Sequence, residues 1–448
     1  MHLPEKSVMQ EAFLHHVWKL GKFDVHELKT TRGEPITIID RGQWNHHAGP
    51  DFLNARMKIG SIVWEGHVEI HLTAKEWKEH QHHTDPAYNN VILHVVLNDN
   101  GPALTAKGHS LPTLELKDRI PAGLMTQYAS LRKNLDPIPC RNLLPGLDRL
   151  RQIQWIERLA IDRLESKAKR ILREWNLHKE GEQAFFALLC SYAGGKVNQE
   201  AYMHLARKTE VQKIWKIRAF PQQIEAYLLG MAGLIPHSSK DVYARLLLRE
   251  FEFLKRKWGL QPIDAVEWRF FRMRPANFPT LRLAQLSALY VRKGRWLPWV
   301  LEASYEELLE GFNLQLSGYW RNHYVFDRLS KTREKPIGTA QIHKWIINVI
   351  APLRVAFSLL NPNVSLKQSA LDLLEQLPPE SNTLIQEWTR LQVPPDNALH
   401  SQGLLELRKE WCTPKKCLRC AFGSYFLEQP HPISKVEEAF ISTLIREP

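Results

Sequence analysis

The stretch from Trp64 to Leu72 alternates ionisable with mostly apolar residues, and this pattern constrains the fold more than any other feature. Successive side chains of a strand point to opposite faces, so the alternation predicts a strand with two different faces. Uncompensated buried charge is costly, so a half-buried ionisable face must pair, protonate or hold a cation. We expect one face to be core, with Trp64, Val68, Ile70 and Leu72, and the other to carry Glu65, His67, Glu69 and His71.

The surrounding sequence predicts a small mixed domain. β-Branched and alternating residues predict strands over 36–40 and 52–59, and Gly60-Ser61 is a two-residue turn into a strand over 62–72. Apolar spacing predicts a helix over 7–20, with Ser7 as its N-cap and Gly21 as its stop, and Thr73 can cap a helix over 74–80. The apolar run 91–97 predicts a strand covered on both faces. The expected order is α-β-β-β-α-β.

Helical periodicity dominates the rest of the chain. Residues 41–49 are expected to be a loop, 113–116 an extended segment and 136–140 a linker. Helices are predicted over 150–175, 241–258, 342–360 and 366–377, the last with Ser365 as N-cap. At 448 residues the chain is too long for one ordinary core. We therefore expect an α+β domain over 1–140 and a mainly α-helical region, with one or two subdomains, over 141–448.

Charge and histidine are unevenly distributed. The first 146 residues carry 16 Lys and Arg against 16 Asp and Glu, so the net charge of +12 lies in the remainder, whereas 13 of the 20 histidines lie in the first part. This division indicates a chemical module joined to a region that could hold DNA or RNA. The alternative interpretation is a basic background without a function.

Composition also bounds the environment. No uncharged apolar run approaches the roughly 18 residues of a membrane span, and the first residues contain no apolar signal segment. Five cysteines, an odd number, argue against a disulfide framework. We expect a cytoplasmic protein without a membrane partner, and its oligomeric state stays open.

Two short motifs lie at the predicted hairpin. Pro50-Asp51 opens one strand, and Glu69-Ile70-His71 lies near the end of the next. In this order of elements they resemble the PD-(D/E)xK nuclease-like superfamily, a restriction-endonuclease-like fold whose core is also α-β-β-β-α-β. The resemblance implies that Asp51 and Glu69 hold a divalent cation, usually magnesium, which activates water against a phosphodiester. Glu11, in the first helix, is implied as a further acid.

One position departs from that superfamily. Its usual lysine is His71 here. A histidine can orient or deprotonate water at neutral pH, but it is also a ligand that suits manganese, zinc or iron better than magnesium. His67, on the same face, is a further candidate ligand, so the divalent metal stays open. The alternative interpretation is a sheet face of solvated Glu and His pairs.

The segment after the hairpin is dense in ligand types. His82, His83 and Asp85 could serve a second metal or a phosphate, or could form a solvated loop. His94 lies inside an apolar strand and is expected to be a hydrogen-bonded core residue.

Near the C-terminus, Cys412, Cys417 and Cys420 follow a Cys-x4-Cys-x2-Cys spacing. Cys-x2-Cys is the bidentate unit of zinc sites and also occurs in iron–sulfur proteins. Both need a fourth ligand, and the alternative is unliganded packing thiols. Cys190, in an apolar run, is expected in the core. The candidates for the fourth ligand are Cys140, His400 and His431.

Residues 268–282 interleave arginines with aromatics and include two prolines, which indicates a structured loop. Arginine binds phosphate and aromatics stack on unpaired bases, so this segment is a candidate nucleic-acid surface. The alternative is a buried turn in which the arginines hold carboxylates and helix ends. The arginines are Arg269, Arg272, Arg274 and Arg282.

These motifs, together with residues 45–52 and 274–279, look like a bacterial family known only as a domain of unknown function. The resemblance runs nearly end to end and implies no activity. Our leading hypothesis is a metal-dependent nuclease, with magnesium or manganese at the hairpin and a basic helical region that binds nucleic acid. The alternatives are a non-catalytic nucleic-acid- or protein-binding scaffold with a degraded nuclease fold, and a zinc or iron hydrolase acting on another substrate.

Overall fold

The chain forms two compact units. The computed structural model describes residues 10–45, 47–178, 180–360 and 364–429. Unit 1 comprises Met1–Trp155, Leu391–Val393 and Leu407–Pro448, and unit 2 comprises Ile156–Arg390 and Pro394–Glu406. This division differs from the predicted boundary at residue 140, because the segment that carries the C-terminal cysteines folds with the N-terminal part of the chain.

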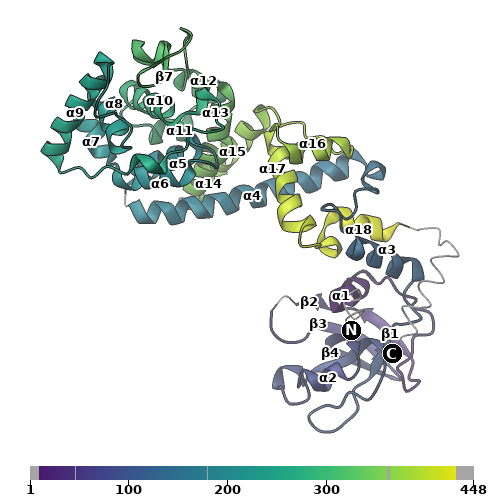
Figure 1. The fold of residues 1–448 in the computed structure, drawn as a ribbon. Helices are drawn as coiled ribbons and strands as arrows, with labels where there is room; N and C mark the ends of the chain where they lie inside the picture. Colours follow the sequence, from purple (N-terminus) through teal and green to yellow (C-terminus); the bar gives the residue numbers. More distant parts are fainter. Residues whose placement is uncertain (1–9, 46, 179, 361–363, 430–448) are drawn as a thin grey trace, which may run out of the picture. The chain divides into compact units, whose positions relative to one another are not determined.

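Unit 1 is built on a six-stranded mixed sheet of order β1-β3-β4-β5-β6, with β2 paired to β3 (Figure 1). β1, β3 and β4 are antiparallel, whereas β5 runs parallel to β4 and β6 parallel to β5. The strands are β1 (Ile36–Asp40), β2 (Gln43–Trp44), β3 (Phe52–Ile59), β4 (Ile62–Thr73), β5 (Val91–Asn98) and β6 (Thr113–Glu115).

Helices complete the expected order of elements. α1 (Glu11–Leu20) precedes the sheet, buries Phe13 and Trp18, and ends at Gly21 with φ 64°, as predicted. A parallel pair needs a crossover, and α2 (Glu76–Glu79) with the short η2 (Pro86–Tyr88) supplies it between β4 and β5. The predicted mixed sheet region followed by a mainly helical part is confirmed. Ser7, the predicted N-cap of the first helix, lies outside the described residues.

β4 does not have one buried and one exposed face, as its alternation predicted. Trp64, expected in the core, is 43% exposed, whereas Glu69 and His71 are 4% and 0% exposed. β5 pairs with β4 only from His67 onward, so the first residues of β4 extend past it. The second half of β4 is therefore covered on both faces, and its ionisable side chains lie in the interior.

A bulge interrupts the pairing of β3 with β4. The register shifts between Phe52 and Ala55, so that two residues of β3 oppose His67. Asn54 takes a left-handed φ of 57°, and its backbone N–H donates to His67 Nδ1 at 3.3 Å. The bulge thus ties His67 to the backbone of β3.

Other local predictions need correction. α2 is a single turn whose N-cap is Lys75, so Thr73 is not its cap; Thr73 Oγ1 donates instead to Glu76 Oε1 at 3.3 Å. The expected loop over 41–49 contains β2, which pairs with β3. The turn at Gly60-Ser61 is confirmed.

The predicted linker 136–140 is an ordered part of unit 1. Ile138 is fully buried, and Asn134 Nδ2 donates to the carbonyl oxygen of Pro139 at 2.8 Å. The linker interpretation was wrong because this proline-rich segment packs rather than bridges. The other elements of unit 1 are α3 (Ala122–Lys133), η3 (Leu144–Gly146), η8 (Leu407–Cys412), η9 (Cys417–Arg419) and α18 (Ala421–Glu428).

Unit 2 is mainly helical (Figure 1). Its large apolar core includes Phe185, Trp296 and Trp345. Its longer helices are α4 (Arg149–His178, which begins in unit 1), α5 (Gly181–Ala193), α6 (Gln199–Lys208), α8 (Pro221–Met231), α9 (Val242–Trp258), α10 (Pro279–Arg292), α14 (Ala351–Leu360), α15 (Val364–Gln376), α16 (Thr383–Arg390) and α17 (Ala398–Glu406). Its shorter elements are α7 (Val211–Lys216), η4 (Ala265–Glu267), η5 (Pro275–Asn277), α11 (Leu297–Glu302), α12 (Tyr305–Gly311), η6 (Gly318–Arg321), β7 (His323–Val325), β8 (Arg328–Leu329), α13 (Thr339–Trp345) and η7 (Ile346–Ile350).

The four predicted helices of this region are present, with two corrections. The helix expected over 342–360 is interrupted by the π-helical η7, and α15 begins at Val364, so Ser365 lies inside it. The stretch Thr339–Leu360 is long and apolar enough to cross a membrane by length and composition alone, and 67% of its apolar window is buried. Such burial is typical of a core helix.

Candidate metal centre

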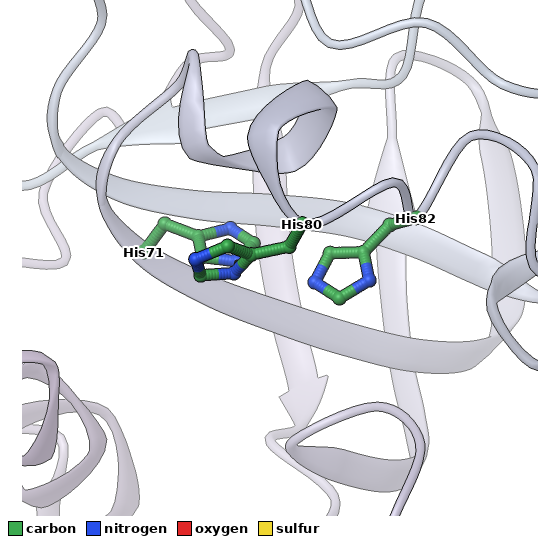
Figure 2. Close-up of side chains that lie close together, drawn as sticks. All are labelled: His71, His80 and His82. Carbon is green, nitrogen blue, oxygen red and sulfur yellow. The ribbon is translucent and has the colours of Figure 1, made fainter.

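Three histidines converge beside the end of β4 (Figure 2). His71 lies on β4, and His80 and His82 reach in from the segment that follows α2. One ring nitrogen from each lies within 4.8 Å of the other two, and His71 Nε2 is 3.2 Å from His80 Nδ1. We call these three residues the imidazole cluster.

The carboxylate of Glu69 lies against this cluster. Glu69 Oε1 is 3.2 Å from His82 Nε2 and 3.6 Å from His71 Nε2. His82 Nε2 is buried and, among the described residues, has no hydrogen-bond partner of good geometry. A tetrahedral ion with ligands at about 2.1 Å has ligand–ligand edges of about 3.4 Å. Three of the donor pairs, His71–His80, Glu69–His71 and Glu69–His82, lie 3.2 to 3.6 Å apart, close to that edge, so the three imidazoles could hold one cation with Glu69 beside it.

Aromatic side chains hold the cluster in place. Trp77, on α2, is 2% exposed, and its indole N–H donates to the carbonyl oxygen of Leu104 at 2.8 Å. The ring of Tyr88 stacks on His82 with centroids 3.8 Å apart. The crossover between β4 and β5 is therefore anchored, and it carries His80 and His82 to the strand.

A fourth histidine supports His71 from behind. His94, on β5, places Nε2 2.8 Å from His71 Nδ1, and both residues are fully buried. Burial, together with the neighbouring His94, lowers the pKa of His71 to about 2, and burial lowers the pKa of His94 to about 4. Both rings are neutral near neutral pH, which is the metal-binding form of imidazole. The prediction of His94 as a hydrogen-bonded core residue is confirmed.

Glu69 is also perturbed. Burial raises the pKa of Glu69 to about 7, although the contact with His82 opposes this shift; the charge of Asp51 adds to it. A bound cation would favour the ionised carboxylate. Protonation of Glu69 would therefore compete with the binding of a cation near neutral pH.

A second group of ligand atoms comprises Glu11, His15 and Asp51. His15 Nε2 is 3.1 Å from Asp51 Oδ2 and 3.6 Å from Glu11 Oε1. Burial lowers the pKa of His15, but its contacts with Asp51 and Glu11 outweigh burial and raise the pKa to about 9. His15 is therefore a cation at neutral pH that is shared between the two carboxyl groups.

Asp51 and Glu69, the predicted metal pair, are neighbours. The backbone N–H of Asp51 donates to Glu69 Oε2 at 3.1 Å, and the N–H of Ile70 donates to Asp51 Oδ2 at 2.9 Å. Each carboxylate thus accepts a hydrogen bond from a backbone N–H group with one of its oxygens. Glu69 faces the imidazole cluster and Asp51 faces His15, so their sharing of one ion stays a prediction.

Two other predicted residues of this region, His67 and Asp85, make local hydrogen bonds with the backbone. His67 accepts a bond from β3 and belongs to neither group, and Asp85 caps η2 by accepting the N–H of Ala87 at 2.9 Å. Sequence reasoning missed His15 and His80 as site residues. His15 lies four residues after Glu11 on the same helix face, and that spacing could have revealed it.

The five cysteines separate into two sets. Cys190 is fully buried in unit 2, as predicted. Of the predicted fourth ligands, His400 lies in unit 2 beside Glu157, at 3.3 Å, and His431 lies outside the described residues. Cys140, Cys412, Cys417 and Cys420 are all buried in unit 1, and all are free thiols.

The arginines predicted to bind nucleic acid in unit 2 comprise three exposed residues and one buried residue. Arg269, Arg272 and Arg274 are exposed, and the neighbouring Phe271 is 82% exposed. Arg282 lies in α10, is 7% exposed, and donates to Gln285 Oε1 at 2.8 Å and Asn277 Oδ1 at 2.7 Å. The prediction that Arg282 contacts nucleic acid was wrong, because the fold uses its guanidinium internally.

Unit 2 also contains a cavity of about 690 Å³. Burial lowers the pKa of Lys167, which lines it, to about 7. Lys167 Nζ is 2.6 Å from Gln402 Oε1 and 2.8 Å from Asn348 Oδ1, and His204 Nδ1 is 3.0 Å from the carboxylate of Glu267. These polar groups are satisfied by the fold itself, so we place the candidate chemistry at the imidazole cluster.

The fold and site define a two-unit protein with a candidate metal centre in its mixed α and β part. The chain belongs to the family described as "Protein of unknown function (DUF2851)", whose model matches residues 11–383. The expected membership of an uncharacterised family is therefore confirmed. No curated protein matches the chain, and no solved structure matches it.

Proposed function

We propose that unit 1 is a metal-dependent hydrolase of phosphodiester bonds, with nucleic acid as its substrate. The observation that carries this proposal is the set of donors at Glu69, His71, His80 and His82, in which three of the donor pairs lie 3.2 to 3.6 Å apart. A divalent ion bound there would lower the pKa of a bound water and supply the nucleophile.

The donor set favours zinc, manganese or iron over magnesium. Three imidazoles and one carboxylate suit these metals, whereas magnesium prefers oxygen ligands. His80 is the exposed member of the set, so solvent reaches the centre from its side. The metal proposed here therefore differs from the magnesium that the superfamily resemblance implies.

The roles of the ionisable groups follow from their charge. A pKa of about 2 leaves His71 too weakly basic to take a proton from water near neutral pH, so we assign it to metal binding. His15, with a pKa of about 9, is a cation that pairs with Asp51 and Glu11, so we assign it to holding the Asp51 carboxylate beside the centre.

The order of elements supports a nuclease-like core. A helix, three antiparallel strands, a helical crossover and a parallel strand follow one another as in the PD-(D/E)xK superfamily, with β2 and β6 as additions. In unit 2, the exposed Arg269, Arg272 and Arg274 beside Phe271 supply a surface suited to phosphate and unpaired bases.

Cleavage assays with metal-stripped full-length protein test the proposal. Zinc, manganese, iron or magnesium would be returned singly, and single- and double-stranded DNA and RNA supplied. We expect cleavage with zinc, manganese or iron, and at least about a 100-fold loss in His80→Ala and His82→Ala, because each removes a metal ligand. His109→Ala, at an exposed histidine of unit 1, is the matched control and should retain activity. Activity unaffected by both cluster variants would refute the assignment.

The imidazole-rich donors also favour a second candidate, a zinc or iron hydrolase of another substrate. Under this alternative the protein binds metal at the cluster and cleaves chromogenic esters but no nucleic acid. Salt-dependent nucleic-acid binding without any cleavage would instead support the scaffold interpretation.

A further inference from the structure

The three segments that carry the cysteines of unit 1 meet one another. Lys415 Nζ donates to the carbonyl oxygen of Arg132, at the end of α3, at 2.7 Å. The rings of Trp155 and Trp411 pack edge to face with centroids 4.9 Å apart. The chain around Cys140, which follows α3, is thereby joined to the chain around Cys412.

The Cys-x2-Cys pair forms a tight backbone loop. The N–H of Cys420 donates to the carbonyl oxygens of Lys416 at 3.1 Å and Cys417 at 3.3 Å. A Cβ on Gly423 would lie 2.2 Å from the carbonyl oxygen of Cys417, so only glycine allows the chain to fold back this closely. Burial raises the pKa of Cys420, and bonds from the backbone N–H groups of Gly423 and Phe422 oppose that rise. Such N–H donors stabilise a thiolate sulfur.

The electrostatics of the four thiols agree with these contacts. Burial raises the pKa of Cys140, and the charges of Cys420 and Cys417 raise it further. The pKa of Cys412 is raised by burial and then by the charges of the other three cysteines. For Cys190, in unit 2, burial is the whole cause of the raised pKa. The contacts of Lys415 and Trp411, with which these effects agree, place the segment of Cys140 beside the C-terminal cysteines, although more than 270 residues separate them in sequence.

We propose that Cys140, Cys412, Cys417 and Cys420 ligate a metal centre that fastens the C-terminal segment to the N-terminal fold. All four side chains are buried in unit 1, contacts of Lys415 and Trp411 join the segments that carry them, and four thiolates make a complete ligand set for zinc or an iron–sulfur cluster. Cys140 supplies the fourth ligand that the spacing Cys-x4-Cys-x2-Cys lacks. This centre is separate from the imidazole cluster and does not rest on the hydrolase proposal.

The spacing of the thiols favours an iron–sulfur cluster over a single ion. Among the residues that the structure describes, no three cysteine sulfurs lie within 4.8 Å of one another. A zinc ion with sulfurs at about 2.3 Å would set them about 3.8 Å apart. A cluster of several irons and sulfides is larger and is also held by four thiolates.

Metal analysis of full-length protein purified without oxygen tests this centre. We expect iron, acid-labile sulfide and broad visible absorption in the wild type, and loss of all three in Cys140→Ser and Cys420→Ser. Cys190→Ser is the matched control, because it removes an equally buried thiol from unit 2, and it should keep the iron. His80→Ala should also keep the iron, which separates this centre from the imidazole cluster.

Two other outcomes of the metal analysis would overturn part or all of the proposal. One zinc per chain without colour, lost in Cys140→Ser, would support the four-thiolate ligand set and overturn the cluster. Wild-type protein with neither metal, in which native alkylation labels all four thiols, would overturn the whole proposal. This alkylation arm uses wild-type protein only, so a folding defect in a serine variant leaves the test decisive.

Discussion

Replacing Glu69 by glutamine in metal-free protein should change how the stability of unit 1 depends on pH. Burial raises the pKa of Glu69 from 4.5 to about 7. Between these values the folded carboxyl binds a proton that the unfolded chain has released, so the free energy of unfolding falls as pH rises. At about 1.36 kcal/mol for each unit of pKa, the wild type should lose about 3 kcal/mol across this window relative to the variant.

The comparison with the variant is necessary because His71 titrates in the opposite sense. Its pKa is lowered from 6.5 to about 2, so below pH 6.5 the unfolded chain binds a proton that folded His71 does not. The contribution of His71 to the free energy of unfolding therefore rises with pH up to about 6.5, within the window in which that of Glu69 falls. The raised pKa of His15 gives a contribution that is complete below pH 6.5 and lost as pH rises through about 9, outside the window. The difference between wild type and Glu69→Gln therefore isolates Glu69.

Hydrogen exchange in peptides from β4 and β5, followed across a urea series at pH 4.5 and pH 7, reads the stability of unit 1 separately. Glu65→Gln is the matched control on the same strand, since its side chain is 70% exposed and pairs with Arg56 at the surface. Parallel pH dependence in wild type and Glu69→Gln would refute the reasoning, because Glu69 would then be solvated or already paired.

Three further predictions concern packing and surface. Trp77→Ala should destabilise unit 1 by about 3–5 kcal/mol, and Trp64→Ala, at a side chain 43% exposed, by much less, as measured by the same exchange series; equal effects would contradict the burial of α2. Gly66→Ala would place a Cβ 2.4 Å from the carbonyl oxygen of Asn90 and should reduce exchange protection in β5, whereas Gly146→Ala, with open space around it, should not. Arg272→Ala should weaken DNA or RNA binding and reduce its salt dependence without changing the melting temperature, while Arg282→Ala should lower that temperature through the loss of two internal bonds; the reverse pattern would refute the assignment of these arginines.

Local sequence signals predicted most of the sheet. The alternation in β4, the Gly60-Ser61 turn and the apolar β5 each depend on neighbours in sequence, and all three elements are present. Exposure was harder to predict, because it depends on pairing between distant segments. Trp64 is exposed since β5 begins to pair only at His67, and no pattern within β4 contains that information.

The candidate site was only partly predictable for the same reason. Glu69 and His71 were found because they share a face of one strand. His80 was missed as a site residue because its position depends on how far a one-turn helix carries the chain back, which Trp77 and its bond to Leu104 determine. Arg282 was misassigned because its partners, Asn277 and Gln285, compete with solvent only once α10 has packed.

Anomalous diffraction from crystals of the full chain grown with zinc tests the proposed metal centre most directly. We predict a zinc peak about 2.0–2.2 Å from Glu69 Oε1, His71 Nε2, His80 Nδ1 and His82 Nε2. A peak shared by Asp51 and Glu69 without the imidazoles, or no peak beside β4, would contradict the account.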